Sequence, residues 1–238
     1  PATPKIIVLD PGHGGSDPGA ENKRLGVNEK TFTLDVALHL RKLLLAEGWR
    51  VLLTRDDDRE LSMIKVTDLQ MRDELAQDNK ADLFVSIHFN VAERDAEHTT
   101  GVETYIMSPQ FMLSSGDKKD DKTDVAFPSN KLDYANLFFG EQMHRTMIAT
   151  LKTSDRGLKH GRRAVLRLLD CPGVLVECAF LSNDAEARRV ATPEFRQQIA
   201  VGLATGLHNY VATLATLRPP APVITPPSAP FSSSSKSP

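Results

Sequence analysis

IIVLDPGHGG, residues 6–15, predicts a short buried strand that ends in a glycine-rich turn. Four apolar residues, most of them β-branched, favour an extended segment, and Asp10 with Pro11 ends it. The glycines that surround His13 let the backbone take positive φ and come close to a partner. Because a strand ending in such a turn commonly carries a ligand at its carboxyl end, the stretch predicts a binding site.

Three kinds of site compete for this turn. A dinucleotide-binding fingerprint, G-x-G-x-x-G, requires a glycine where Asp17 stands. A nucleophile elbow, G-x-S-x-G, requires a glycine where Pro18 stands. The third interpretation makes His13 a metal ligand on tight backbone, whereas a lone histidine in a turn is more often an ordinary polar residue. The rest of the chain has to decide between these last two possibilities.

The composition is that of an ordinary globular protein. The chain has 238 residues, of which 40% are hydrophobic and 25% are charged, so it can bury a real core. Its formal charge of −2 gives no reason to expect nucleic acid as a partner. No apolar run approaches the roughly 20 residues that a membrane helix needs. Cys171 and Cys178 are too far apart along one extended strand to pair, so both are expected to be free thiols.

Strand and helix patterns alternate along the chain. Besides the first strand, apolar runs predict strands at residues 49–55, 83–90, 101–107, 164–167 and 174–178. Helical periodicity predicts helices over residues 29–47, 67–79, 132–151 and 194–217. Asn28 is a suitable N-cap for the first helix, and Gly48 is placed to end it.

We therefore expect a three-layer α/β fold with a mostly parallel central sheet of about six strands and helices on both faces. Residues 1–217 would form this one domain. Residues 218–238 are dense in proline and serine, which predicts a disordered or polyproline-rich tail or linker.

Three side chains lie at the predicted carboxyl ends of strands, and a fourth lies near that edge. His13, His88 and Glu177 each end a strand, while Glu29 opens the first helix. Each has a structural explanation of its own, such as a helix N-terminus that favours the Glu29 carboxylate. Because the carboxyl ends of parallel strands face one crevice, their convergence favours a shared site. Two histidines and a glutamate form a common catalytic zinc set, which leaves a second glutamate as general base.

The chain resembles the zinc-dependent N-acetylmuramoyl-L-alanine amidases of the amidase_3 family, which act on the bacterial cell wall. The resemblance spans roughly residues 5–211 and keeps the order of the family motifs. The matching segments are IVLDPGHGG (7–15), NEK (28–30), SIHFN (86–90), DRGLK (155–159), VLR (165–167) and VLVECAFLSN (174–183).

The resemblance implies a site and a reaction. It makes His13, Glu29 and His88 ligands of one Zn²⁺ ion and Glu177 the catalytic acid/base. A zinc-bound water would attack the amide between the lactyl group of N-acetylmuramic acid and L-alanine in peptidoglycan. Asn90 and Arg167 are further candidates for substrate contact. The substrate in turn implies a periplasmic or extracellular location.

Two features depart from the family pattern, and two rival functions stay open. Cys178 stands where the family often has glycine. The segment 108–129 is too short for the cavity-covering helix of some relatives, so we expect that no protein activator is required. The rivals are a zinc exopeptidase acting on free peptides and a non-catalytic module that binds the cell wall.

Overall fold

The computed structural model describes residues 6–116 and 121–217. A six-stranded sheet crosses the domain and is mostly parallel, as predicted. Its order is β4 (Arg50–Leu53), β1 (Ile6–Pro11), β5 (Leu83–Asn90), β8 (Gly173–Phe180), β6 (Val102–Ile106) and β7 (Asp155–His160). Strands β6 and β7 run parallel to each other, and β6 runs antiparallel to β8. The predicted tail, 218–238, lies outside the described residues.

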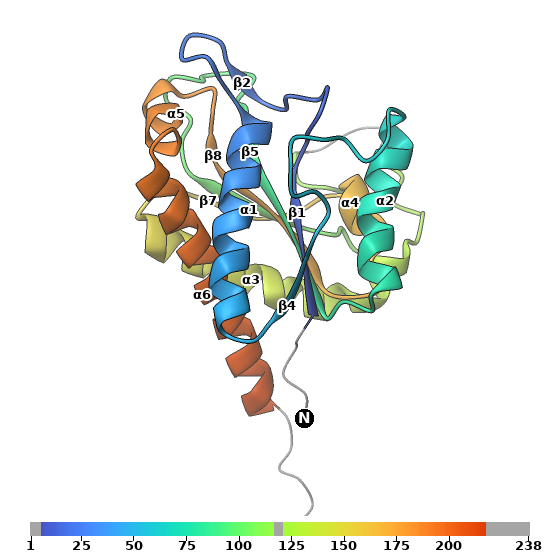
Figure 1. Ribbon diagram of the computed structural model, residues 1–238. Helices are drawn as coiled ribbons and strands as arrows, with labels where there is room; N and C mark the ends of the chain where they lie inside the picture. The colour runs from blue at the N-terminus through green and yellow to red at the C-terminus, as the bar shows by residue number, and fades with distance from the viewer. Residues whose placement is uncertain (1–5, 117–120, 218–238) are drawn as a thin grey trace, which may run out of the picture.

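Helices cover both faces of the sheet (Figure 1), which confirms the predicted three-layer arrangement. One face carries α1 (Glu29–Ala46), α3 (Asp133–Leu151), α5 (Asp184–Val190) and α6 (Pro193–Leu217). The other face carries the shorter α2 (Lys65–Asp78) and α4 (Ala164–Arg167). A two-stranded ribbon, β2 (Glu21–Asn22) with β3 (Val27–Asn28), precedes α1, and a 3-10 helix, η1 (Pro128–Leu132), precedes α3.

The central strands contribute side chains to two hydrophobic cores because successive side chains of a strand point to opposite faces of the sheet. In β8, Val174 and Val176 belong to the core under α1, α3 and α6, whereas Leu175 belongs to the core under α2 and α4. In β1, Ile7 and Val8 divide in the same way. A strand that is buried on both faces appears in the sequence as a continuous apolar run, which explains why β1 and β8 could be predicted from the sequence.

Helix α1 begins and ends where the sequence predicts. The Asn28 side chain accepts a hydrogen bond from the backbone N–H of Thr31 at 3.2 Å, as an N-cap does. Glu47 follows the last helical turn, and Gly48 then takes a φ of +85°. The capped first turn holds Glu29, its first residue, at the edge where β1 ends.

One predicted strand is wrong, and a different segment supplies the sixth strand. Residues 164–167 form the single helical turn α4, whose Val165 and Leu166 are buried in the second core. The sixth strand is β7, DRGLKH, which lies at the end of the sheet and is only partly buried. An edge strand with exposed sides does not need an apolar run, so β7 lacks the pattern by which buried strands are found.

One smaller expectation is also confirmed. Cys171 and Cys178 are both buried and unpaired, as predicted. Among the helices of residues 6–116 and 121–217, none is both long and apolar enough to cross a membrane.

Candidate active site

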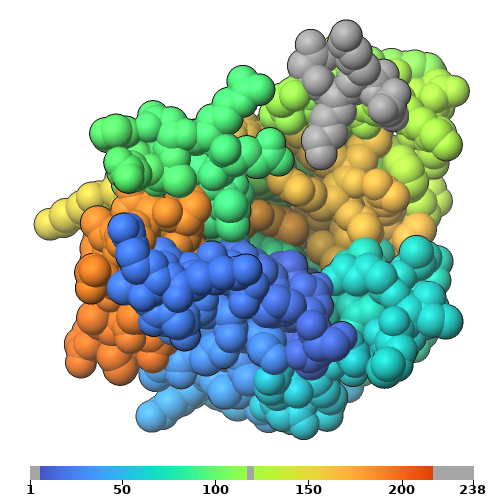
Figure 2. All heavy atoms as spheres, turned by 90° about the horizontal axis from the view of Figure 1, so that it is seen from above, coloured from blue at the N-terminus to red at the C-terminus, as the bar shows by residue number. Residues whose placement is uncertain are grey.

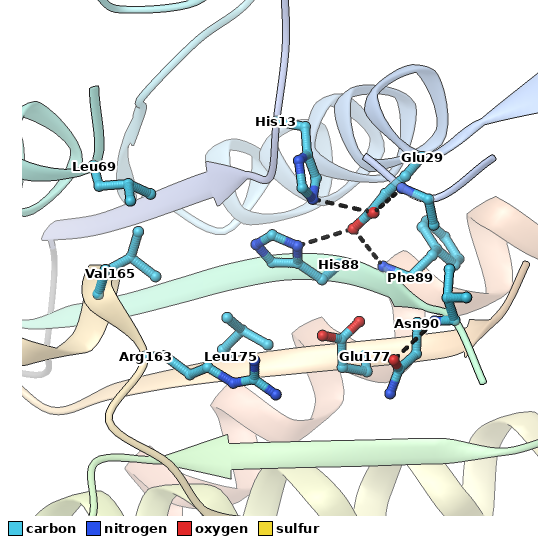
Figure 3. Close-up of a pocket in the computed structure, with 13 residues that line it drawn as sticks. His13, Glu29, Leu69, His88, Phe89, Asn90, Arg163, Val165, Leu175 and Glu177 are labelled. Carbon is cyan, nitrogen blue, oxygen red and sulfur yellow. Dashed lines mark hydrogen bonds and ion pairs between the residues drawn. The ribbon is translucent and has the colours of Figure 1, made fainter. Parts of the chain in front are cut away.

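Three elements bring His13, Glu29 and His88 together at the carboxyl ends of the parallel strands (Figure 3). His13 follows β1, Glu29 begins α1, and His88 lies near the end of β5. Glu29 Oε2 is 3.1 Å from His13 Nε2, and Glu29 Oε1 is 2.9 Å from His88 Nδ1. One ligand atom from each residue lies within 4.8 Å of the others. The sheet thus unites groups that are 75 residues apart in the sequence at most.

Backbone donors fix the Glu29 carboxylate between the two imidazoles. The N–H of Ala20 donates to Oε2 at 2.7 Å, and the N–H of Phe89 donates to Oε1 at 2.9 Å. Burial raises the pKa of Glu29, but hydrogen bonds and charge from His13 and His88 outweigh burial and hold that pKa below its usual range. The carboxylate is therefore ionised and oriented, as a metal ligand requires.

Two glycines leave the space that these side chains occupy. A Cβ at Gly12 would lie 2.2–2.6 Å from three atoms of the His88 ring. A Cβ at Gly19 would lie 2.5 Å from Glu29 Oε2, and Gly19 also has a φ of +66°, which favours glycine. His13 itself takes a φ of +63°, a strained conformation for a residue with a side chain.

Two buried arginines hold the turn that carries His13. Arg55 donates to the carbonyls of Pro11 and Gly12, at 3.1 and 3.0 Å. Arg72 donates to the carbonyls of Pro11 and His13, at 3.1 and 3.0 Å. Both side chains are almost fully buried, and their charge-assisted bonds stabilise the strained backbone. Sequence reasoning missed this role, although Arg72 stood on the apolar stripe of the second predicted helix.

The charge of these arginines is partly balanced by Asp10. Its Oδ1 accepts hydrogen bonds from Arg72 at 2.8 Å and from Thr54 at 2.7 Å, and its Oδ2 accepts one from Ser86 at 2.6 Å. Burial raises the pKa of Asp10, but Arg72 and the two hydroxyls outweigh it and lower that pKa. An ionised aspartate therefore lies beneath the turn.

Glu177 lies beside this cluster because of strand register. It pairs with His88 of β5 on one side and with Glu103 of β6 on the other. Its carboxylate is directed into the same cavity (Figure 3), and Oε2 has no hydrogen-bond partner among the described residues. Burial, helped by the charges of Glu29 and Glu103, outweighs the opposing charges of His88 and Arg163 and raises the pKa of Glu177 to about 7.

A cavity of about 330 Å³ opens over these residues. Seen from above, it is a hollow between the blue N-terminal residues and the green and orange segments (Figure 2). Its lining combines the four polar residues described above with apolar side chains and one cation: His13, Ala20, Glu29, Leu69, His88, Phe89, Asn90, Val91, Arg163, Ala164, Val165, Leu175 and Glu177.

Of the two predicted substrate contacts, the structure places only one at the cavity. Asn90 lines the cavity, and its amide donates to Glu103 Oε2 at 2.9 Å. The structure does not bring Arg167 to the cavity, because its guanidinium donates to the carbonyl of Arg162 and lies over the Phe127 ring. The arginine at the cavity is Arg163, which precedes α4. With residues 164–167 expected to be a strand, sequence reasoning could not place these arginines correctly.

The His13, Glu29 and His88 donor atoms suit a zinc ion. Zinc–ligand bonds of about 2.0–2.2 Å in a tetrahedral site separate neighbouring ligand atoms by about 3.4 Å. Glu29 Oε2 lies 3.1 Å from His13 Nε2 and Glu29 Oε1 lies 2.9 Å from His88 Nδ1, while one ligand atom from each of the three residues lies within 4.8 Å of the others. Asp17 Oδ2 lies 2.9 Å from His13 Nδ1, so a carboxylate lies on the far side of the ring.

Comparison with known sequences gives the same family over most of the chain. Residues 7–209 match the model of Amidase_3, N-acetylmuramoyl-L-alanine amidase. The chain is 33% identical over 236 residues to the amidase AmiC of Escherichia coli O6:H1, covering 90% of this chain and 54% of AmiC. It is 34% identical over 205 residues to the sporulation-specific amidase of Bacillus subtilis, covering 85% and 67%. The chain spans 35–54% of the length of the first three curated relatives.

Solved structures agree with the sequence matches. An N-acetylmuramoyl-L-alanine amidase from Clostridium difficile 630 superposes with a TM-score of 0.71 at 27% identity, covering 89% of this chain and 99% of that one. The catalytic domain of CwlV from Bacillus (Paenibacillus) polymyxa superposes with a TM-score of 0.70 at 30% identity, covering 87% and 98%. The chain therefore belongs to the Amidase_3 family of bacterial cell-wall N-acetylmuramoyl-L-alanine amidases.

Proposed function

We propose that this chain is a zinc-dependent catalytic domain that hydrolyses the amide between the lactyl group of N-acetylmuramic acid and L-alanine in peptidoglycan. One observation carries the proposal. The unpartnered carboxylate of Glu177 shares a cavity with a histidine–glutamate–histidine cluster in a chain of this amidase family. That combination offers a metal position and a proton acceptor around one space for the scissile bond.

His13, Glu29 and His88 would hold the zinc ion. When bound, zinc supplies a Lewis acid that polarises the scissile carbonyl and makes a water molecule nucleophilic near neutral pH. The chain contributes the geometry of its ligands. Ala20 and Phe89 fix the Glu29 carboxylate through their N–H groups.

Glu177 would act as the general acid/base. Its free oxygen accepts the proton of the attacking water and then donates it to the departing amine of L-alanine. Its place within β8, between hydrogen-bonded strands, holds the carboxylate in position without a competing partner on Oε2. An amide in place of this carboxylate cannot accept a proton, which makes the role testable.

The cavity would work without an activator, and its substrate would place the protein in the periplasm or at the cell exterior. None of the lining residues comes from segment 108–129, and residues 108–116 and 121–127 contain no helix. Figure 2 shows the hollow open from above. Purified protein should therefore release L-alanine amino termini from isolated peptidoglycan with no partner present.

The test is Glu177→Gln, with zinc content, melting temperature and turnover measured on the same preparation. The change keeps the side-chain volume, so zinc content and fold should persist while kcat falls about 10²–10⁴-fold. Glu141→Gln, the same change at a half-exposed position on α3, is the matched control and should retain full turnover. His88→Ala should lose zinc and turnover together.

Several results would contradict the proposal. Loss of zinc from Glu177→Gln would make this residue a ligand, and turnover within a few-fold of the parent would remove it from the reaction. Cleavage of free peptides but not of peptidoglycan would favour an exopeptidase. Binding to cell wall with neither zinc nor cleavage would favour a non-catalytic module.

A further inference from the structure

We propose that Arg163 forms a subsite for a carboxylate of the stem peptide, so that the enzyme prefers a peptide with a free acid near the scissile bond over its amidated form. The inference rests on the proposed function and names a specificity-determining residue for it.

Arg163 is a cation in the cavity with no carboxylate within ion-pair distance among the described residues, although its charge acts on Glu177 and opposes the effect of burial on the pKa of that carboxyl. It lines the cavity together with Ala164, Val165 and Leu175, which are apolar. Its guanidinium lies 4.1 Å from the centroid of the Tyr105 ring, and Figure 3 shows it extended along β8 toward Glu177. The Tyr105 ring face holds the guanidinium, which also donates a hydrogen bond to the Tyr105 hydroxyl, and its remaining N–H donors are available to a ligand.

The nearby carboxylate on this wall, Glu103, is already fully engaged. Its Oε1 accepts hydrogen bonds from Arg156 and Lys159, and its Oε2 from Asn90 and Tyr105, at 3.0, 2.6, 2.9 and 2.9 Å respectively. Glu103 is 3% exposed, so no further donor is needed to satisfy it. Three cations on this wall, Arg156, Lys159 and Arg163, face two acids, Glu103 and Glu177. One positive charge is therefore in excess, and an anion from outside would balance it.

Strand register places the residue that holds this cation relative to the reaction centre. Glu177 pairs with Glu103, and Leu175 pairs with Tyr105, two residues further along the antiparallel strands. Two residues of a strand span about 6.6 Å. The backbone of Tyr105 thus lies about one repeat of the sheet away from the row that contains Glu177, and the Arg163 side chain over the Tyr105 ring extends from there toward Glu177.

A stem peptide has a carboxylate at a matching distance. The residue that follows L-alanine is a γ-linked glutamate, whose α-carboxyl group is either free or converted to a primary amide. One extended residue spans about 3.3–3.6 Å, and this group lies two such lengths, or about 7 Å, from the scissile carbonyl. A guanidinium recognises a carboxylate with two parallel hydrogen bonds, which a primary amide cannot accept in the same way.

The experiment compares two soluble muramoyl peptides that differ only at this group, one with a free acid and one with a primary amide. The parent enzyme should favour the acid by about 10- to 100-fold in kcat/KM, mainly through KM, as expected for hydrogen bonds to a charged group. Arg163→Gln should lose this preference by weakening the acid substrate while the amide is much less affected. Arg163→Lys should restore part of the preference, and Arg145→Gln, at an exposed position on α3, should retain it in full.

Equilibrium binding separates this inference from the proposed reaction. The same two peptides are titrated calorimetrically into the Glu177→Gln variant with and without Arg163→Gln, so discrimination is measured even if no bond is cleaved. Equal binding of acid and amide by the Arg163-containing protein would overturn the subsite. A fall in kcat for both peptides alike in Arg163→Gln would also overturn it and would assign Arg163 to the reaction centre. Absence of cleavage by the parent, with discrimination retained, would refute only the proposed reaction.

Discussion

Replacing Asp73 by asparagine should change how the stability of the protein depends on pH. Asp73 lies on α2 with 1% of its surface exposed, and its Oδ1 has no hydrogen-bond partner among the described residues. Burial, together with the charge of Asp10, raises the pKa of Asp73 to about 8, against opposing effects of the Leu168 N–H and Arg167. The folded protein therefore keeps this carboxyl protonated at neutral pH.

The sign follows from proton linkage. Below pH 4 the carboxyl is protonated in both states and carries no pH-dependent cost. Between pH 4 and pH 8 the unfolded chain releases the proton while the folded chain keeps it. The free energy of unfolding therefore falls by about 1.36 kcal/mol per pH unit over this window. At pH 7 the penalty from Asp73 reaches about 4 kcal/mol, and it levels off above pH 8.

The assay is urea denaturation at pH 5, 6, 7 and 8, followed by circular dichroism in the presence of a chelator so that metal binding does not contribute. Because asparagine does not titrate, the variant should gain stability relative to the parent, with the gap growing by about 4 kcal/mol from pH 5 to pH 8. Asp78→Asn, the same substitution at an exposed position of α2, is the control and should follow the parent. Parallel stability curves for parent and Asp73→Asn would refute the buried, protonated carboxyl.

Two further substitutions probe how the backbone places the ligands. Gly12→Ala puts a methyl group within 2.2–2.6 Å of the His88 ring, so the ring must move and zinc affinity should fall at least ten-fold. Titration against a chromogenic chelator measures the zinc affinity, and an unchanged affinity would contradict this prediction. Asn28→Ala removes the cap of α1 and should cost about 1 kcal/mol in denaturant unfolding, whereas Asn28→Asp should cost little. Equal stability of the two Asn28 variants would show that the cap contributes nothing.

Local sequence patterns were enough to predict the helices and strands whose hydrophobic periodicity follows directly from which of their faces are buried. β1 and β8 are apolar on both faces because each contributes to two cores, so their continuous runs predicted buried strands. The 3.6-residue period and the cap predicted α1, and the structure confirms the Asn28 cap. The same reasoning expected His13, Glu29, His88 and Glu177 at one edge, and the folded chain brings them to one cavity. Their chemical roles stay predictions.

Tertiary structure alone decided the features of the site and of the sheet that depend on pairing between segments far apart in the sequence. The row His88, Glu177 and Glu103 exists because β6 joins β8 antiparallel in one particular register, and no local pattern encodes that register. The polar segment β7 is a strand because it pairs at the edge of the sheet. The apolar run 164–167 is a helical turn because it packs on the face of the sheet.

The identity of the arginine in the cavity follows from the same cause. A sequence pattern does not distinguish Arg163 from Arg167. The helical turn between them places Arg163 at the cavity and Arg167 over the Phe127 ring. Arg55 and Arg72 likewise reach the turn of His13 only through contacts that span at least 43 residues. The sequence by itself determined which groups are candidates for the chemistry, because residue type and period are local properties. The fold determined how those groups are held and what surrounds them, because long-range pairing and burial arise only when the chain is packed.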